Sequence, residues 1–268
     1  MRRSLSLSMA LLLAGAAGLG AQATADQARL MFTLGFGQTS GGGTLWSVGR
    51  QPFILGPGLA DTLAVSRSFG RSLAVTFSGT YFPNDNLGFN VEAQLLGLAT
   101  EDQCSLVTTV GDTLAPDLCR SINGSSRNAS AVGLSAGVVY RAFSRQPLHP
   151  FIRASAGFVV SQQSYLRTAG RVGIDSDSTA AADLTLYADD SPGSIQPYYS
   201  LGGGVVAVVG RGYQFRAEVR DNWVRLPAVA GATPRQGVTP RSDQVGRHFL
   251  TFLIGFDIVL ERKRGRRY

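Results

Sequence analysis

The segment Ser72–Tyr81 has the sequence SLAVTFSGTY, in which two kinds of residue alternate. Every second residue is Leu, Val, Phe, Gly or Tyr, and the residues between them are Ser, Ala and Thr. A period of two is that of a β-strand, whose successive side chains point to opposite faces. The segment is therefore predicted to be a strand with one apolar face and one face of small, mostly polar side chains.

The same alternation recurs along most of the chain. It predicts strands at 29–38, 60–69, 71–82, 87–99, 129–143, 149–162, 194–209, 212–224 and 247–260. Strands of about ten residues with this pattern are typical of barrels that cross a membrane. Hydrocarbon offers no hydrogen-bond partners, so a sheet placed in it must close on itself to pair every backbone group.

A soluble β-sandwich would show the same period, with its polar face in water. The polar faces here carry many Gly, Ala, Ser and Thr residues and few charges, which is unlike a solvated face. Aromatic residues also lie near the ends of the predicted strands, where a membrane barrel has its aromatic girdles. They are Tyr81, Tyr140, Tyr199, Tyr213, Trp223 and Phe249. The sequence thus predicts an all-β, closed antiparallel transmembrane up-and-down barrel.

Membrane barrels usually have an even number of strands, so the segments above need one more strand or one fewer. If the last strand runs toward the periplasm, the long linkers 100–128, 163–193 and 225–246 all lie outside as mobile loops. Thr44–Leu55 is the candidate for a tenth strand, although Pro52 disfavours it. Ten strands are favoured. The alternative is eight strands, with 39–59 as an outer loop and 60–82 as one interrupted strand.

The N-terminus has the pattern of a cleaved secretory signal peptide. Two Arg residues precede an Ala- and Leu-rich stretch at 5–19, and two overlapping small-x-small cleavage sites follow at 21–25. We therefore assign residues 1–25 to the signal peptide, 26–260 to the barrel and 261–268 to a basic tail. The expected location is the outer membrane of a Gram-negative-type bacterium, and no later stretch is apolar for long enough to form a spanning helix.

The formal net charge of +7 arises mostly at the two ends of the chain. The predicted signal peptide holds two Arg and no acid, and the tail holds five bases and one acid. The body is left near neutrality, which is unlike the basic surface of a nucleic-acid-binding domain. No nucleic-acid partner is expected.

The chain has two cysteines, Cys104 and Cys119. In an exported protein the default for such a pair is a disulfide. A shared metal ion is the alternative, but the two histidines, His149 and His248, are distant in sequence. We predict the disulfide, and we expect neither a metal nor a cofactor.

Seven charged residues occupy positions that should face the barrel interior. They are Glu92, Arg141, Arg153, Arg216, Glu218, Arg220 and Asp257. The interior of a small barrel is filled by side chains, and an unpaired buried charge costs several kcal/mol. These residues are therefore predicted to form an ion-pair network that fills the lumen. The alternative is a narrow polar pore, for which ten strands could leave room and eight could not.

The signal peptide, the LGFG and SAG-type strand pieces and the aromatic last strand resemble the small outer-membrane barrel-domain proteins, the porin-like and outer-membrane-protein-A-like group. The resemblance covers nearly the whole mature chain. It implies that the last strand carries a signal for the barrel-assembly machinery, matched here by Phe252, Ile254, Phe256 and Ile258. That family usually ends with an aromatic residue on this strand, whereas eight residues follow Leu260 here.

These observations favour a structural or surface-interaction role in the outer membrane, with lipid and lipopolysaccharide as partners and no enzymatic activity. A narrow porin for small polar solutes is the first alternative. A hydrolase, either a protease or a lipid-modifying enzyme, is the second, with Asp189, Asp190 and His248 at the outer rim. The aspartates of linker 163–193 could attract calcium, but their spacing matches no EF-hand. No feature of the sequence specifies an oligomeric state.

Overall fold

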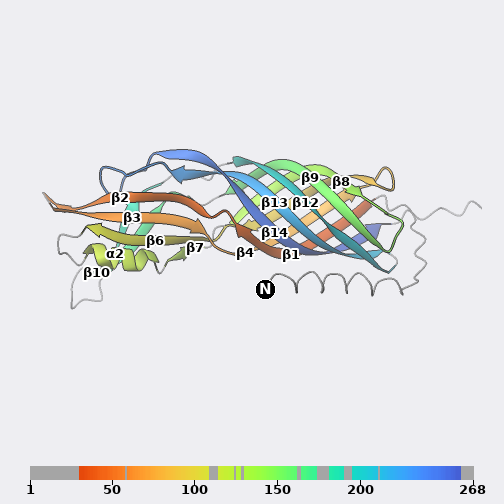
Figure 1. Ribbon diagram of the computed structural model, residues 1–268, viewed down its shortest axis with the longest axis horizontal. Helices are drawn as coiled ribbons and strands as arrows, with labels where there is room; N and C mark the ends of the chain where they lie inside the picture. The colour runs from red at the N-terminus through yellow and green to blue at the C-terminus, as the bar shows by residue number, and fades with distance from the viewer. Residues whose placement is uncertain are drawn as a thin grey trace, which may run out of the picture.

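The computed structural model describes residues 30–57, 59–108, 114–123, 125–127, 130–161, 164–173, 181–189, 195–210 and 212–260. Eight antiparallel strands form a closed barrel in the order β1-β14-β13-β12-β9-β8-β5-β4 (Figure 1). They are β1 (Leu30–Gly41), β4 (Ser72–Tyr81), β5 (Leu87–Gly97), β8 (Ser130–Arg141), β9 (Leu148–Ser161), β12 (Ile195–Gly210), β13 (Tyr213–Val229) and β14 (Ser242–Leu260). The predicted signal peptide and basic tail lie outside the described residues.

The favoured count of ten strands is wrong, and the alternative of eight is the correct count. The two extra segments do form strands, β2 (Thr44–Gly56) and β3 (Leu59–Phe69), but these belong to a separate sheet. They cannot enter the barrel because β1 pairs directly with β4, from Leu30 opposite Tyr81 to Thr39 opposite Ser72.

Three glycines separate the barrel from this second sheet. Gly41, Gly42 and Gly43 have φ values of +107°, +80° and +57°, a region that glycine enters at little cost. They turn the chain from β1 into β2. On the way back, Gly70 and Arg71 link β3 to β4.

The segments between the barrel strands form a folded unit at one end of the barrel, which we call the distal domain. It consists of the described parts of 44–69, 100–127, 164–189 and 225–247. Its main sheet has the order β2-β3-β6-β7, with β6 (Thr100–Thr108) and β7 (Ser126–Arg127), beside the hairpin of β10 (Thr168–Gly173) and β11 (Ala181–Tyr187). Helix α2 (Leu114–Asn123) contacts β6 and β10. Figure 1 shows this domain extending the barrel along its long axis. The prediction of loose outer loops is thus replaced by a folded domain.

The outward face of the barrel is apolar. On β14 the side chains from Leu250 to Leu260 that point outward are each between 36% and 58% exposed. Comparable rows occur on the other barrel strands, whereas the only exposed large apolar side chains among the described residues of the distal domain are Ile54, Leu106 and Val107. We call the barrel rows the apolar belt. An exposed apolar surface of this extent indicates that this face of the barrel contacts other apolar molecules or surfaces.

Aromatic residues mark both rims of this belt. Tyr81, Tyr140 and Tyr213 lie at the terminal rim, where β1 begins and β14 ends, and Tyr199 and Trp223 lie at the far rim. Phe249, also predicted for a girdle, instead faces inward because its strand places it opposite the buried Asn222. Its ring packs edge-on against Phe69, with 4.8 Å between ring centroids. Among the described residues, no helix is both long and apolar enough to cross a membrane.

A disulfide joins Cys104 on β6 to Cys119 on α2, as predicted, with 4.9 Å between the Cα atoms. The Asn123 side chain adds a second link, because its Nδ2 donates to the Cys104 carbonyl (2.9 Å) and its Oδ1 accepts from the Cys104 amide (2.6 Å). Both links hold the helix against the edge of the sheet.

Replacing both cysteines by Ala is expected to lower the stability of the distal domain by about 3 kcal/mol, since the bridge closes a loop of 15 residues. Denaturation followed through the fluorescence of the buried Trp46 measures this change. Reductant should reproduce the shift in the wild type and add nothing in the double variant. Equal midpoints for the wild type and the variant would contradict the prediction.

Candidate functional site

The interior of the barrel is polar at its centre because alternate residues of each strand point inward. On β13 the inward positions are Arg216, Glu218, Arg220 and Asn222, all buried. An eight-stranded barrel is just wide enough for side chains to fill it. Charged side chains inside the barrel must therefore form ion pairs and hydrogen bonds with one another rather than with water.

Arg220 is the centre of the resulting network. Its Nη1 and Nη2 donate to the two carboxylate oxygens of Glu92 across the lumen, at 2.5 and 3.0 Å. Its Nε and Nη2 also donate to Glu218 on the same strand, at 2.5 and 3.0 Å. All three side chains are at most 2% exposed. The planar guanidinium suits this arrangement, because its five donors can serve two carboxylates at once.

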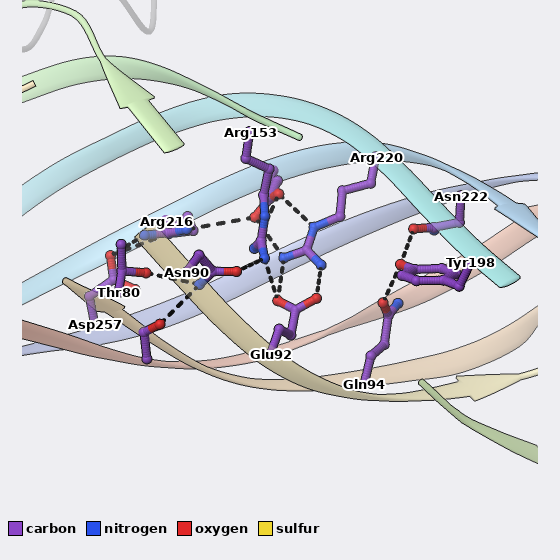
Figure 2. A network of polar contacts seen from close by, with 12 residues as sticks. Thr80, Asn90, Glu92, Gln94, Arg153, Tyr198, Arg216, Arg220, Asn222 and Asp257 are labelled. Atoms are coloured by element: carbon purple, nitrogen blue, oxygen red, sulfur yellow. Dashed lines mark hydrogen bonds and ion pairs between the residues drawn. The ribbon is translucent and has the colours of Figure 1, made fainter. Parts of the chain in front are cut away.

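Two further arginines extend the network. Arg153 lies 3.0 Å from Glu92 and 3.7 Å from Glu218, and it also donates to Asn90. Arg216 lies 3.2 Å from Asp257 and 3.8 Å from Glu218. Figure 2 shows Arg153 and Arg220 converging on Glu92, with Arg216 and Asp257 to one side.

The predicted network is present, and its charges balance. Three arginines, Arg153, Arg216 and Arg220, face three carboxylates from β5, β13 and β14. A neutral total matters in a lumen that excludes bulk water, because each unpaired ion there costs several kcal/mol. We call these six residues the lumen network.

Arg141 was predicted to join the network and does not. It is buried near the terminal rim, where among the described residues no carboxylate lies within ion-pair distance of it. Its guanidinium lies 3.5 Å from the centroid of the Phe82 ring and donates to the Asp85 carbonyl at 3.2 Å. The reason is its position at the last residue of β8, beside a turn rather than at mid-barrel.

Glycine makes room for the central arginine. Gly202 on β12 lies opposite Arg220, and a Cβ atom there would come within 2.7 Å of Arg220 Cγ. Any larger residue at 202 would push Arg220 away from its two carboxylates.

A neutral polar layer lies on the far-rim side of the network. The Tyr198 hydroxyl lies 2.7 Å from Gln94 Oε1 and 2.6 Å from Asn222 Oδ1 (Figure 2). Asn222 Nδ2 donates to Thr251 Oγ1 at 2.7 Å. These residues were not predicted from the sequence because they carry no charge. The available signal was position, since Gln94 follows Glu92 by two residues and Asn222 follows Arg220 by two.

Apolar side chains occupy both ends of the lumen. A small cluster lies at the terminal rim: Met31, Phe82, Val139, Phe151 and Val206. At the far rim Leu96, Val159 and Phe249 belong to one continuous apolar core with Trp46 and Leu63 of the distal domain. The charged centre of the barrel therefore lies between two groups of apolar side chains, and Arg141 is buried against the group at the terminal rim.

The distal domain contains a second buried ion pair. Arg67 on β3 donates from Nε and Nη2 to the two oxygens of Asp102 on β6, at 2.5 and 2.7 Å. It also donates to the Tyr165 carbonyl at 2.6 Å and to the Arg167 carbonyl at 2.8 Å, so it ties the sheet to the segment that leads into β10. Its guanidinium lies 5.3 Å from the centroid of the Trp46 ring.

A neutral buried cluster supports the same domain. Gln51 on β2 accepts from the Tyr187 hydroxyl and from the Thr233 amide, each at 2.9 Å, and donates to Thr233 Oγ1 at 2.8 Å. Burial raises the pKa of Tyr187, so its hydroxyl remains a hydrogen-bond donor throughout the physiological range. Neither Arg67 nor Gln51 was identified from the sequence.

Two of the three residues proposed for a hydrolytic rim site are described, and their surroundings differ. His248 is exposed, and its Nδ1 lies 2.9 Å from Asp221 Oδ2. Asp189 is buried and accepts a hydrogen bond from Ser164, and Asp190 lies outside the described residues. Within the described part of the chain, no group of three or more metal-binding side chains is found.

No protein-family model matches this chain, and neither does any curated protein. Among solved structures, Neisserial surface protein A is similar at 11% identity, covering 86% of this chain and 96% of that one, with a TM-score of 0.39. The outer membrane protein AlkL is similar at 15% identity over 89% and 93%, with a TM-score of 0.43. The N-terminal β-barrel domain of Pseudomonas aeruginosa OprF is similar at 12% identity over 86% and 98%, with a TM-score of 0.32. The chain is thus structurally similar to small outer-membrane β-barrels, and the likeness is one of fold.

Proposed function

We propose that this protein is a non-conducting outer-membrane β-barrel that anchors a folded domain at the cell surface. The observation that carries the proposal is the filling of the lumen: a neutral network of ion pairs lies at mid-barrel, between two groups of buried apolar side chains. Such an interior holds the barrel together and fills the lumen with side chains that bind one another. The role is structural or surface interaction rather than catalysis.

The apolar belt supports the membrane location. Its rows of Leu, Phe, Ile and Val cover the outward face of the barrel strands and are flanked by aromatic residues at both rims, which is the surface of a barrel in lipid. Outer-membrane lipid is therefore its first partner. With an even number of strands both ends of the barrel sequence lie on one side, which we assign to the periplasm, and the distal domain then lies outside.

The last strand fits the proposed assembly role. Phe252, Ile254, Phe256 and Ile258 all point outward on β14, which pairs with β1 to close the barrel. An assembly factor could therefore contact them before closure. We retain these four residues as the proposed signal for the barrel-assembly machinery, together with cleavage of a signal peptide at residues 1–25.

Planar-bilayer recording tests the proposal. The purified protein, shown to be folded by its different gel mobility before and after boiling, is expected to give no steady single-channel steps. A general porin reconstituted in the same bilayers provides the positive control. Reproducible conductance steps from the folded protein would reject the closed-lumen proposal and favour the narrow-porin alternative.

A further inference from the structure

Three ring-bearing side chains form a row across neighbouring strands at the far rim. Tyr199 on β12 lies opposite Trp223 on β13, and Trp223 lies opposite His248 on β14. Their ring centroids are 5.4 and 6.1 Å apart, and the Trp223 and His248 rings are nearly parallel, at 14°. All three side chains are exposed on the outward face. We call them the rim row.

The rim row lies where the apolar belt ends. On β13 the outward residues between the terminal rim and Val219 are apolar. The next outward residue is Asp221, which lies 2.9 Å from His248, and Trp223 follows it. Two residues beyond Trp223, Arg225 is exposed, and its guanidinium lies 5.9 Å from the Trp223 ring centroid. An exposed aspartate and an exposed arginine belong at the depth of lipid headgroups rather than in hydrocarbon.

The backbone is adapted to this row. Gly246 on β14 lies beside Trp223, and a Cβ atom there would come within 2.7 Å of Trp223 Nε1. A larger residue would displace the indole ring. The absence of a side chain at 246 thus lets Trp223 lie against the barrel wall between Tyr199 and His248.

The surrounding hairpin is strongly basic. Residues 225–247 contain four Arg and one Asp, and Arg225, Arg235 and Arg241 are all exposed. In the proposed orientation this hairpin stands directly above the outer leaflet. Arginine is well suited to phosphate, because its planar guanidinium can donate two parallel hydrogen bonds to it.

We propose that the rim row and Arg225 bind the phosphorylated sugar headgroup of a glycolipid in the outer leaflet. Arg225 contacts the phosphate, and the Trp223 ring contacts the sugar. The inference rests on the proposed membrane location and deepens it, since it assigns one class of lipid to one place on the barrel. The charge of the basic hairpin complements that of the phosphates.

Trp223 offers a direct readout, because the other tryptophan, Trp46, is buried in the distal domain. The protein is placed in phosphatidylcholine nanodiscs with increasing amounts of a lipid A-type glycolipid that carries two phosphates. The tryptophan emission is expected to shift with saturation, and the shift should vanish in Trp223→Phe. Arg225→Gln should weaken the response about tenfold, as expected for loss of one charge-assisted contact.

The controls separate the possible outcomes. Arg171→Gln removes an exposed arginine on β10, whose partner Asp183 is also exposed, and should leave the response unchanged. A dephosphorylated glycolipid, phosphatidylglycerol and soluble inorganic phosphate should each give a much weaker response. If phosphatidylglycerol matches the glycolipid, or if Arg171→Gln matches Arg225→Gln, general electrostatics explains the effect and the inference is overturned. A folded, inserted barrel without any response rejects this inference alone, whereas failure to insert rejects the membrane location as well.

Discussion

Arg220→Gln is expected to lower the stability of the barrel by about 3–5 kcal/mol, the usual loss when one partner of a buried ion pair is removed. Arg220 serves Glu92 and Glu218 together, with its closest contacts at 2.5 Å. Without it the lumen network has two arginines for three carboxylates. A neutral Gln side chain cannot offset that excess negative charge in an interior closed to water.

The measurement is the midpoint of urea denaturation in detergent, scored by the boiling-dependent change in gel mobility. The matched control is the double variant Glu92→Gln/Arg220→Gln, which restores a neutral total with Arg153, Arg216, Glu218 and Asp257. It should be clearly more stable than Arg220→Gln alone, because neighbouring charges are coupled. Were the double variant as unstable as the sum of its two single changes, the charges would not be acting as a network.

The lumen network could be predicted from the sequence because the period of two determines which residues of a strand point into the barrel. Once the alternate residues of 213–223 are assigned inward, Arg216, Glu218 and Arg220 must all lie in the lumen and need partners. Arg141 has the same inward parity but lies where β8 ends, and parity does not reveal how deep in the barrel a residue sits. The sequence therefore predicted the members of the network better than its boundaries.

The predicted number of barrel strands was wrong because the period of two also does not show which sheet a strand belongs to. β2 and β3 are strands, as their sequences indicated, but a strand in a sheet above the membrane has the same period as a strand within it. What distinguishes them is the outward face, which carries Leu, Phe and Ile in β14 and residues such as Ser47, Gly49 and Ser66 in β2 and β3. The packing of these strands into one apolar core with α2 depends on contacts between distant segments, which no local pattern records.

Arg67 is a residue whose burial, but not its partner, could be predicted from the local sequence pattern. It occupies the same face of β3 as the buried Leu63 and Val65, so the sequence placed a charge among core residues. That placement indicates a buried partner, but Asp102 can be identified only once β3 is known to pair with β6. The signal was therefore present for the arginine and absent for its partner.

Arg67→Gln is the change with the largest expected effect on the distal domain, about 3–5 kcal/mol. It leaves Asp102 buried without its cation and removes the donors to the Tyr165 and Arg167 carbonyls. The segment before β10 would then be held to the sheet less firmly, with the Trp46 Nε1 bond to the Tyr165 carbonyl (3.1 Å) still in place. The barrel, held by the lumen network and by lipid, is expected to remain folded.

Limited proteolysis and gel mobility read these two parts of the molecule separately. In Arg67→Gln the distal domain should become sensitive to added protease, while the boiling-dependent mobility shift of the barrel persists. Arg171→Gln is the matched control, because Arg171 and its partner Asp183 are both about three-quarters exposed and such pairs contribute little. The double change Arg67→Gln/Asp102→Asn should recover part of the protease resistance, since it removes the uncompensated carboxylate. Loss of the barrel shift together with the distal domain would show instead that the two parts unfold as one cooperative unit, coupled through the apolar core that they share at the far rim.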